Sequence, residues 1–246
     1  MDTPTEVALI PQGEDRSAMR QEIRRYPKTP SAQTTVLEYS SLSRATLFFE
    51  DGAFSQGSTQ WGPFSEFGAE LGLIAGDRRL RIVQLFDKKG DLDKITLIRE
   101  RLEGISESER KPLTVADLIG TWHGEAITQY ADLRPEQTYT TRLTVELAGE
   151  KQIRQTLTFG SAPSIASVGT LAGQRILFTG GAQETQILLL PDGGSSTCPV
   201  KITPRQPIIL EAGWLLDART RQRIIRQYDS GGAWVSLTLV TETKGV

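Results

Sequence analysis

Two segments of this 246-residue chain carry nearly the same pattern, and their repetition restricts the fold more than any other feature. Residues 86–100 read FDKKGDLDKITLIRE, and residues 228–242 read YDSGGAWVSLTLVTE. In each segment an aspartate and a glycine mark a turn between two strand-like runs, which is the pattern of a β-hairpin. The same hairpin written twice in one chain predicts a tandem duplication.

The correspondence extends over most of the chain. Gly52 matches Gly193 and Glu70 matches Glu211 with the same spacing, and RQEIRRY near the start matches RQTLTFG after residue 153. Short runs rich in β-branched and aromatic residues, separated by glycine, proline or aspartate, are typical of an all-β barrel or sandwich. The sequence therefore predicts an all-β chain of two tandem antiparallel barrels, at 1–105 and 113–246, joined by a polar linker at 104–112.

The two copies differ at their beginning. The second opens with LTVADLIG, where Thr114 and Asp117 have the spacing of a helix cap, and continues into a strand with GTWHG at residues 120–124. The first copy has no counterpart of this helix and strand, so its barrel is predicted to be incomplete. Two explanations stay open: the first barrel is open at that edge, or translation starts upstream of Met1.

Hairpin geometry predicts which residues lie opposite one another, and alternation assigns them to faces. The predicted pairs are Asp87–Leu92 and Arg79–Glu100 in the first copy, and Asp229–Trp234 and Arg221–Glu242 in the second. The predicted apolar face comprises Leu80, Ile82, Phe86, Ile95 and Leu97 in the first copy, and Ile224, Tyr228, Val235, Leu237 and Leu239 in the second. We expect this face to line each barrel and the arginines on the other face to meet water.

Composition excludes several functions. A net charge of −2 offers no concentrated basic field for nucleic acid, and no apolar run is long enough to span a membrane. A single cysteine, Cys198, and a single histidine, His123, cannot form an internal disulfide or a zinc site of nitrogen and sulfur ligands. No P-loop, dinucleotide-binding motif or nucleophile elbow is present, so no cofactor is expected. We expect a cytoplasmic protein.

Three segments carry a resemblance to a known family: residues 37–74, LLLPDGGSSTCP at 188–199 and EAGWLLDARTRQRIIRQYD at 211–229. They resemble the cyanobacterial and plastid family called domain of unknown function 3598. The resemblance implies two calycin barrels of the lipocalin and fatty-acid-binding type, in which the tryptophan of GTWHG closes a barrel floor. Plant members are similar to a chloroplast factor for ATP synthase biogenesis, which implies binding of the F1 subunits β and γ and, in a plastid, a stromal location.

One functional hypothesis is therefore a non-enzymatic assembly factor that binds a protein partner. The chain has 20 arginines and 8 lysines, and arginine pairs better with partner carboxylates. The candidate partner-binding residues are Arg24, Arg25, Trp61, Phe64, Arg81 and Arg223. Ordinary strand charges on a solvated barrel would give the same pattern.

Two alternatives place the function inside a barrel. A carrier would hold a small apolar ligand, a lipid or a tetrapyrrole, in a lumen, and the candidate contacts are Arg226, Tyr228, Trp122 and Gln84. A bilin lyase of the calycin type would need acids or bases, and Glu211, Asp229 and His123 are available. The repetition of Glu211 and Asp229 as Glu70 and Asp87 in the first copy favours a structural role for these carboxylates.

Overall fold

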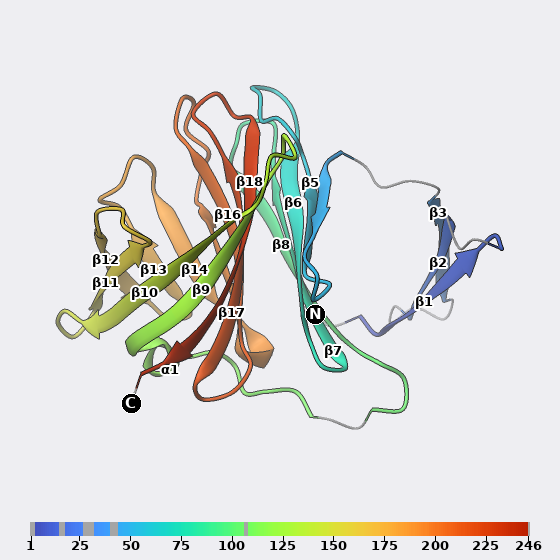
Figure 1. Ribbon diagram of the computed structural model, residues 1–246, viewed down its shortest axis with the longest axis horizontal. Coiled ribbons are helices and arrows are strands. Elements are labelled where there is room, and N and C mark those ends of the chain that lie inside the picture. Colours follow the sequence, from blue (N-terminus) through green and yellow to red (C-terminus); the bar gives the residue numbers. More distant parts are fainter. Residues whose placement is uncertain (1–2, 15–17, 27–31, 40–43, 106–107, 246) are drawn as a thin grey trace. The chain divides into compact units, whose positions relative to one another are not determined.

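The computed structural model describes residues 3–14, 18–26, 32–39, 44–105 and 108–245. These residues form one closed barrel, two open sheets and very little helix, so the predicted all-β fold is confirmed (Figure 1). The chain divides into a unit of residues 1–44 and a unit of residues 45–246, and each is described by itself.

The first unit holds a three-stranded antiparallel sheet. Its strands are β1 (Thr5–Gln12), β2 (Ala18–Arg25) and β3 (Gln33–Tyr39), in that order. Arg20 of β2 pairs with Glu22 and with Glu38 of β3, at 2.9 and 3.1 Å. The contact with Glu38 links two neighbouring strands, and the contact with Glu22 lies within β2.

The second unit contains a five-stranded sheet and a barrel. The sheet runs in the order β4 (Thr46–Phe48), β5 (Phe54–Gly57), β6 (Phe67–Ala75), β7 (Arg78–Phe86) and β8 (Leu92–Arg101). The closed barrel comprises β9 (Gly120–Tyr130), β10 (Gln137–Leu147), β11 (Gln152–Phe159), β12 (Ile165–Ala172), β13 (Arg175–Phe178), β14 (Thr185–Leu189), β15 (Gly194–Pro199), β16 (Ile208–Leu215), β17 (Thr220–Tyr228) and β18 (Trp234–Lys244). A 3-10 turn, η1 (Pro191–Gly193), precedes β15.

The order β4 to β8 repeats the order β14 to β18, as a duplication requires. Arg79 lies opposite Glu100, and Arg221 lies opposite Glu242, as predicted. The predicted pairs nearest the turn are wrong by one residue, because each hairpin contains a bulge and Leu92 faces Phe86 rather than Asp87. In the second copy the same bulge places Trp234 opposite Tyr228 rather than Asp229.

The two aspartates instead shape the turns. One carboxylate oxygen of Asp87 accepts hydrogen bonds from the backbone N–H groups of Lys89 and Asp91, at 2.8 and 3.0 Å. Asp229 accepts the same two bonds from Gly231 and Ala233, at 2.8 and 3.0 Å. The repeated sequence therefore encodes the same turn twice.

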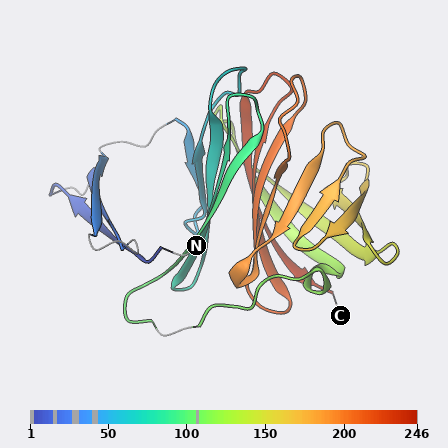
Figure 2. The same ribbon diagram turned by 180° about the vertical axis from the view of Figure 1, so that it is seen from behind.

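The predicted orientation of the second copy is wrong. Its apolar residues Leu210, Trp214 and Ile224 lie outside the closed barrel, where they pack against the apolar face of β6 and β7 in one shared core. Arg221 and Arg223 alternate with them and therefore point into the barrel. Alternation separates two faces of a strand, but it does not tell which face another sheet will cover. Figure 2 shows the sheet and the barrel side by side from behind.

The opening of the second copy follows the prediction. Helix α1 (Val115–Leu118) begins after Thr114, whose backbone N–H and hydroxyl donate to the carboxylate of Asp117 at 2.9 and 2.6 Å. The indole N–H of Trp122 donates to the carbonyl of Leu118 at 2.9 Å, and the ring is fully buried. The helix and the tryptophan therefore close one end of the barrel, which we call the floor.

The described residues of the first copy form two open sheets rather than a closed barrel. The division into barrels at 1–105 and 113–246 stays a prediction, and Met1 lies outside the described residues. Of the linker, residues 106–107 also lie outside them. The last residues of the linker are hydrogen-bonded to η1. The N–H of Arg110 donates to Asp192 at 2.8 Å, and the carbonyl of Lys111 accepts from the N–H of Gly193 at 3.0 Å. No helix in the described ranges has the length and apolar character needed to cross a bilayer.

Candidate functional site

A buried cluster of ion pairs lies inside the barrel, on the inward faces of β16, β17 and β18. Arg221 Nε donates to Glu242 Oε1 at 2.6 Å, and Arg223 Nε donates to the same oxygen at 2.9 Å. Arg223 Nη1 donates in turn to Glu211 Oε2 at 3.2 Å. Because two guanidinium groups face two carboxylates, the cluster has no net charge.

The cluster becomes more exposed with distance from the floor. The side chain of Glu242 is 0 % exposed, whereas that of Glu211 is 14 % exposed. Burial opposes ionisation of Glu242, but the charges of Arg223 and Arg221 and their hydrogen bonds lower the pKa of this carboxyl below its usual range. Arg223 is thus a partner of two glutamates inside the molecule, and its predicted role as an exposed partner contact is wrong.

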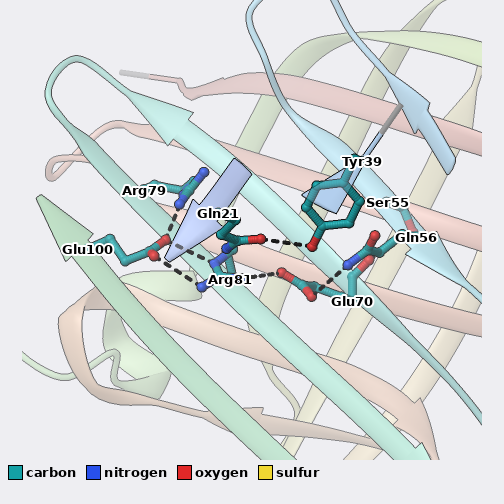
Figure 3. Close-up of polar contacts among 8 residues, drawn as sticks. All are labelled: Gln21, Tyr39, Ser55, Gln56, Glu70, Arg79, Arg81 and Glu100. Atoms are coloured by element: carbon teal, nitrogen blue, oxygen red, sulfur yellow. Dashed lines mark hydrogen bonds and ion pairs between the residues drawn. The ribbon is translucent and has the colours of Figure 1, made fainter. Parts of the chain in front are cut away.

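The first copy contains the equivalent cluster (Figure 3). Arg79 Nε and Arg81 Nε donate to Glu100 Oε2 at 2.6 and 2.9 Å, and Arg81 Nη1 donates to Glu70 Oε1 at 2.5 Å. Burial disfavours the charged carboxyl of Glu100, but hydrogen bonds from Arg79 and the charge of Arg81 lower its pKa. Since both copies place two arginines and two glutamates in the same register, the clusters belong first to the repeated fold.

Arg226 and Tyr228 were predicted to contact a ligand in the lumen, and both lie instead in the shared core outside the barrel. Arg226 is fully buried and donates to the backbone carbonyls of Ala45 and Ser58 at 3.2 and 3.0 Å. The central carbon of its guanidinium group, Cζ, lies 3.6 Å from the ring centre of Trp234. Arg226 Nε donates to the hydroxyl of Tyr228 at 2.7 Å. The arginine therefore holds the chain around β5 against the barrel.

Gln84, the counterpart of Arg226 in the first copy, is placed in the same core and not in a lumen. Its side-chain amide donates to Ser196 Oγ at 2.7 Å and to the backbone carbonyl of Glu211 at 3.1 Å. Trp122 does face the barrel interior, but it forms the floor, with Arg221 and Lys244 lying 4.5 and 4.8 Å from its ring centre. Of the four predicted lumen residues, Trp122 alone points inward.

The remaining predicted partner contacts differ in their accessibility. Phe64 is 86 % exposed, whereas the partly buried Trp61 packs against the shared core, and its backbone N–H donates to the carbonyl of Gly232 at 2.8 Å. Arg24 and Arg25 are exposed on β2. On the second unit, Phe64 is thus accessible to a protein partner but little of Trp61 is; on the first unit, Arg24 and Arg25 are accessible.

The candidate acids and bases lie in different environments. Glu211 points into the barrel, His123 is exposed on the outer face of β9, and Asp229 is used in a hairpin turn. Burial raises the pKa of the Cys198 thiol to about 12, so this group is a poor nucleophile. Across the residues that the structure describes, no three histidine, cysteine, aspartate or glutamate side chains are grouped to hold a metal ion.

The sequence did not reveal that the apolar face of the second copy points out of the barrel. It therefore did not predict that Glu211 and Thr197 point into the barrel. Thr197 lies opposite Glu211 on neighbouring strands, and its hydroxyl is 3.5 Å from Glu211 Oε1. The signal was present in the sequence, because the residues that alternate with Leu210 and Trp214 are the polar or small Glu211 and Gly213. The alternation did not tell that the sheet of the first copy covers the apolar face of the second copy.

Comparison with known proteins gives matches over nearly the whole chain. Residues 1–105 match the family described as domain of unknown function (DUF3598), N-terminal, and residues 109–245 match the family described as biogenesis factor required for ATP synthase 1, C-terminal domain. A search of curated proteins found no match.

Two solved structures were also compared with the chain. A DUF3598 protein of unknown function from Nostoc punctiforme is 44 % identical, with a TM-score of 0.93, and the match covers 100 % of this chain and 89 % of the other. An S-type phycobiliprotein lyase from Guillardia theta is 13 % identical, with a TM-score of 0.43 over 53 % of this chain and 90 % of the other.

Proposed function

Since this chain belongs to the DUF3598 family, and its second copy matches the C-terminal domain of a biogenesis factor for ATP synthase, we propose that it assists the assembly of ATP synthase. The match over residues 109–245 is the observation that carries the proposal. The proposed partners are the F1 subunits β and γ, and the protein acts with them in the cytoplasm, or in the stroma of a plastid.

In this proposal the chain binds its partners without catalysing a reaction. The separation of His123, Glu211 and Asp229 supports this, because acid–base chemistry requires such groups within reach of one reacting centre. The repetition of the ion-pair cluster in both copies supports a structural role for most of the buried charges.

The proposed contacts for the partner are the exposed Phe64 and the exposed arginines of β2. An aromatic side chain that is 86 % exposed offers apolar area which a partner can bury. Arg24 and Arg25 offer guanidinium groups to carboxylates on the partner. Arg81 and Arg223 are already bound to glutamates of this chain, so they contribute to the fold and not to the contact.

The direct test uses the purified full-length protein with purified β and γ subunits in separate binding measurements. We expect saturable binding to at least one subunit, and about tenfold weaker binding for Phe64→Ala. Leu133→Ala is the matched control, because Leu133 is also a loop residue with positive φ and is 79 % exposed. Absence of binding to both subunits at micromolar concentrations would overturn the proposal.

A further inference from the structure

Several apolar side chains that point into the barrel keep accessible surface, which indicates an interior that the side chains do not fill. Register identifies the inward-facing residues of β11, β14 and β17, among them Leu157, Ile187 and Ile225. These three apolar residues point into a closed barrel, yet each remains partly exposed. In a packed interior such residues would have no accessible surface, as is nearly the case for Ile153 and Ile176 beside the floor.

The number of strands gives a physical reason for this space. A barrel of about eight strands has an interior that side chains can just fill, and wider barrels leave room for a ligand. This barrel closes with the strand order β9 to β18. Residues at the end away from Trp122 are also open to solvent: Phe159 is partly exposed, and Ile165 and Ile209 are 66 % and 42 % exposed. We call this end the mouth.

Among the described residues, the inner surface combines apolar side chains with several acceptors: Glu242 Oε2 and Thr141 Oγ1 have no partner but are buried, whereas Glu211 is partly exposed. Glu211 Oε2 is bound to Arg223, but Glu211 Oε1 has only the hydroxyl of Thr197 at 3.5 Å, the upper limit of a hydrogen bond. The Glu211 side chain is 14 % exposed, and the register directs it into the lumen. A hydrogen-bond donor in the lumen can therefore reach this oxygen.

Charge determines which ligands suit the site. Arg221, Arg223, Glu211 and Glu242 already balance one another, so a ligand that brings a net charge into this interior would leave it unpaired at a cost in free energy. A fatty acid anion would also face the carboxylate of Glu211 directly. A neutral head group avoids both penalties.

We propose that the barrel binds one molecule of a neutral amphiphile, whose hydroxyl or amide group donates a hydrogen bond to Glu211 Oε1 and whose apolar chain lies against Leu157, Ile187 and Ile225. This function goes beyond assembly of ATP synthase and does not depend on it. The ligand enters at the mouth, since α1 and Trp122 close the other end.

The test measures displacement of Nile red, a neutral fluorescent probe of apolar sites, from the full-length protein. We expect saturable binding of the probe, and displacement by dodecan-1-ol at a concentration about tenfold lower than by dodecanoate at pH 8. No saturable binding of Nile red, or equal displacement by the two compounds, would overturn the proposal.

Two variants test whether the lumen itself is the site. Ile187→Trp places a larger side chain in the open space, so it should abolish probe binding while the melting temperature changes little. Val168→Trp is the matched control on the outer face of β12, where Val168 is 43 % exposed, and it should bind as the wild type does. Equal loss of binding in both variants, or a large loss of stability in Ile187→Trp alone, contradicts an open lumen.

A third variant tests the role of charge. Glu211→Gln keeps an acceptor but leaves one positive charge in excess, so it should shift the preference from dodecan-1-ol toward dodecanoate by about tenfold or more. An unchanged preference in a folded Glu211→Gln protein would overturn the assignment of Glu211. If this variant does not fold, the comparison of Ile187→Trp with Val168→Trp still decides whether the lumen is open.

Discussion

Gln84 of β7 and Arg226 of β17 occupy equivalent positions in the two copies, and each donates to the equivalent serine of the other copy. Gln84 Nε2 is 2.7 Å from Ser196 Oγ, and Arg226 Nη1 is 3.3 Å from Ser55 Oγ. The backbone repeats this exchange: Trp61 N–H donates to the carbonyl of Gly232 and Ile202 N–H donates to that of Gly90, both at 2.8 Å.

Reciprocal contacts of this kind define an isologous interface, as in a symmetric dimer. Here both surfaces belong to one chain, so the two copies pack through equivalent faces related by an approximate two-fold axis. This arrangement explains why each copy has an apolar face and why neither leaves that face to water. Each copy thus provides the surface that buries the apolar face of the other copy.

Isolation of the second copy should reveal this self-complementary surface. A chain of residues 108–246 leaves Leu210, Trp214 and Ile224 without the sheet that buries them to 0 % exposure. We expect it to form a dimer through these residues, because a large exposed apolar face favours association. Size-exclusion chromatography with light scattering checks the mass, and a stable monomer at 50 µM or so would count against an isologous face.

Arg226 should be among the residues most important for stability. Arg226→Met removes the hydrogen bonds that the buried guanidinium group donates to the carbonyls of Ala45 and Ser58, and a hydrogen bond from a charged group contributes about 1.5–3 kcal/mol. We expect a loss of about 3 kcal/mol or more in the free energy of unfolding, measured by urea denaturation. The exposed Arg154→Met is the control, and its effect should stay within about 0.5 kcal/mol.

Glu242 should couple stability to acid pH. Its pKa is lowered in the folded protein, so its contribution is present above the pKa of the unfolded chain and is lost as pH falls through the folded value. Glu242→Gln should cost about 3–5 kcal/mol at pH 7, because it leaves Arg221 and Arg223 without their shared carboxylate.

The same variant should also show a weaker dependence of stability on pH below the ordinary range of glutamate. Urea denaturation of wild type and Glu242→Gln between pH 3 and pH 7 measures the difference. If the two proteins lose stability in parallel as the pH falls, the carboxylate does not carry the acid sensitivity assigned to it.

Gly124 gives Glu242 the space that it occupies. A Cβ atom at this position would lie 2.7 Å from the Cβ of Glu242 and 2.6 Å from the carbonyl oxygen of Thr241, closer than packed atoms allow. We expect Gly124→Ala to lower stability by about 1–3 kcal/mol. Gly180→Ala is the control, since a Cβ there meets nothing within 4 Å, and thermal melting of the two variants compares them.

Cys198 should report on opening of the shared core. The thiol is fully buried, and its pKa of about 12 leaves almost no thiolate at pH 8. A thiol reagent should therefore label the native protein very slowly and the urea-unfolded protein within minutes. Rapid labelling of the native protein would show that the packing between sheet and barrel is loose.

Local patterns predicted the elements well, because neighbouring residues determine hairpins and caps. The Asp87 and Asp229 turns, the Thr114 cap and both Arg–Glu pairs follow from short-range spacing. The bulge in each hairpin was missed, since its extra residue leaves the alternation on either side nearly intact.

The positions of the candidate site residues could not be predicted in the same way. Leu210 and Arg223 lie on opposite faces of the sheet, and the alternation of side chains along a strand is enough to predict this. Whether Leu210 points into the barrel or out of it depends on a partner sheet that belongs to the other copy. Alternation alone therefore predicts a position in a lumen for Arg226 and Gln84, although each meets the other copy in the shared core.

The contact between Phe67 of β6 and Tyr228 of β17 tests the packing of the two copies most directly. Their ring centres are 4.9 Å apart in an edge-to-face arrangement, and the rings come from different copies. A double-mutant cycle with Phe67→Leu and Tyr228→Leu, followed by urea denaturation, should give a coupling energy of about 0.5–1.5 kcal/mol. Strictly additive effects would contradict the face-to-face packing of the repeats.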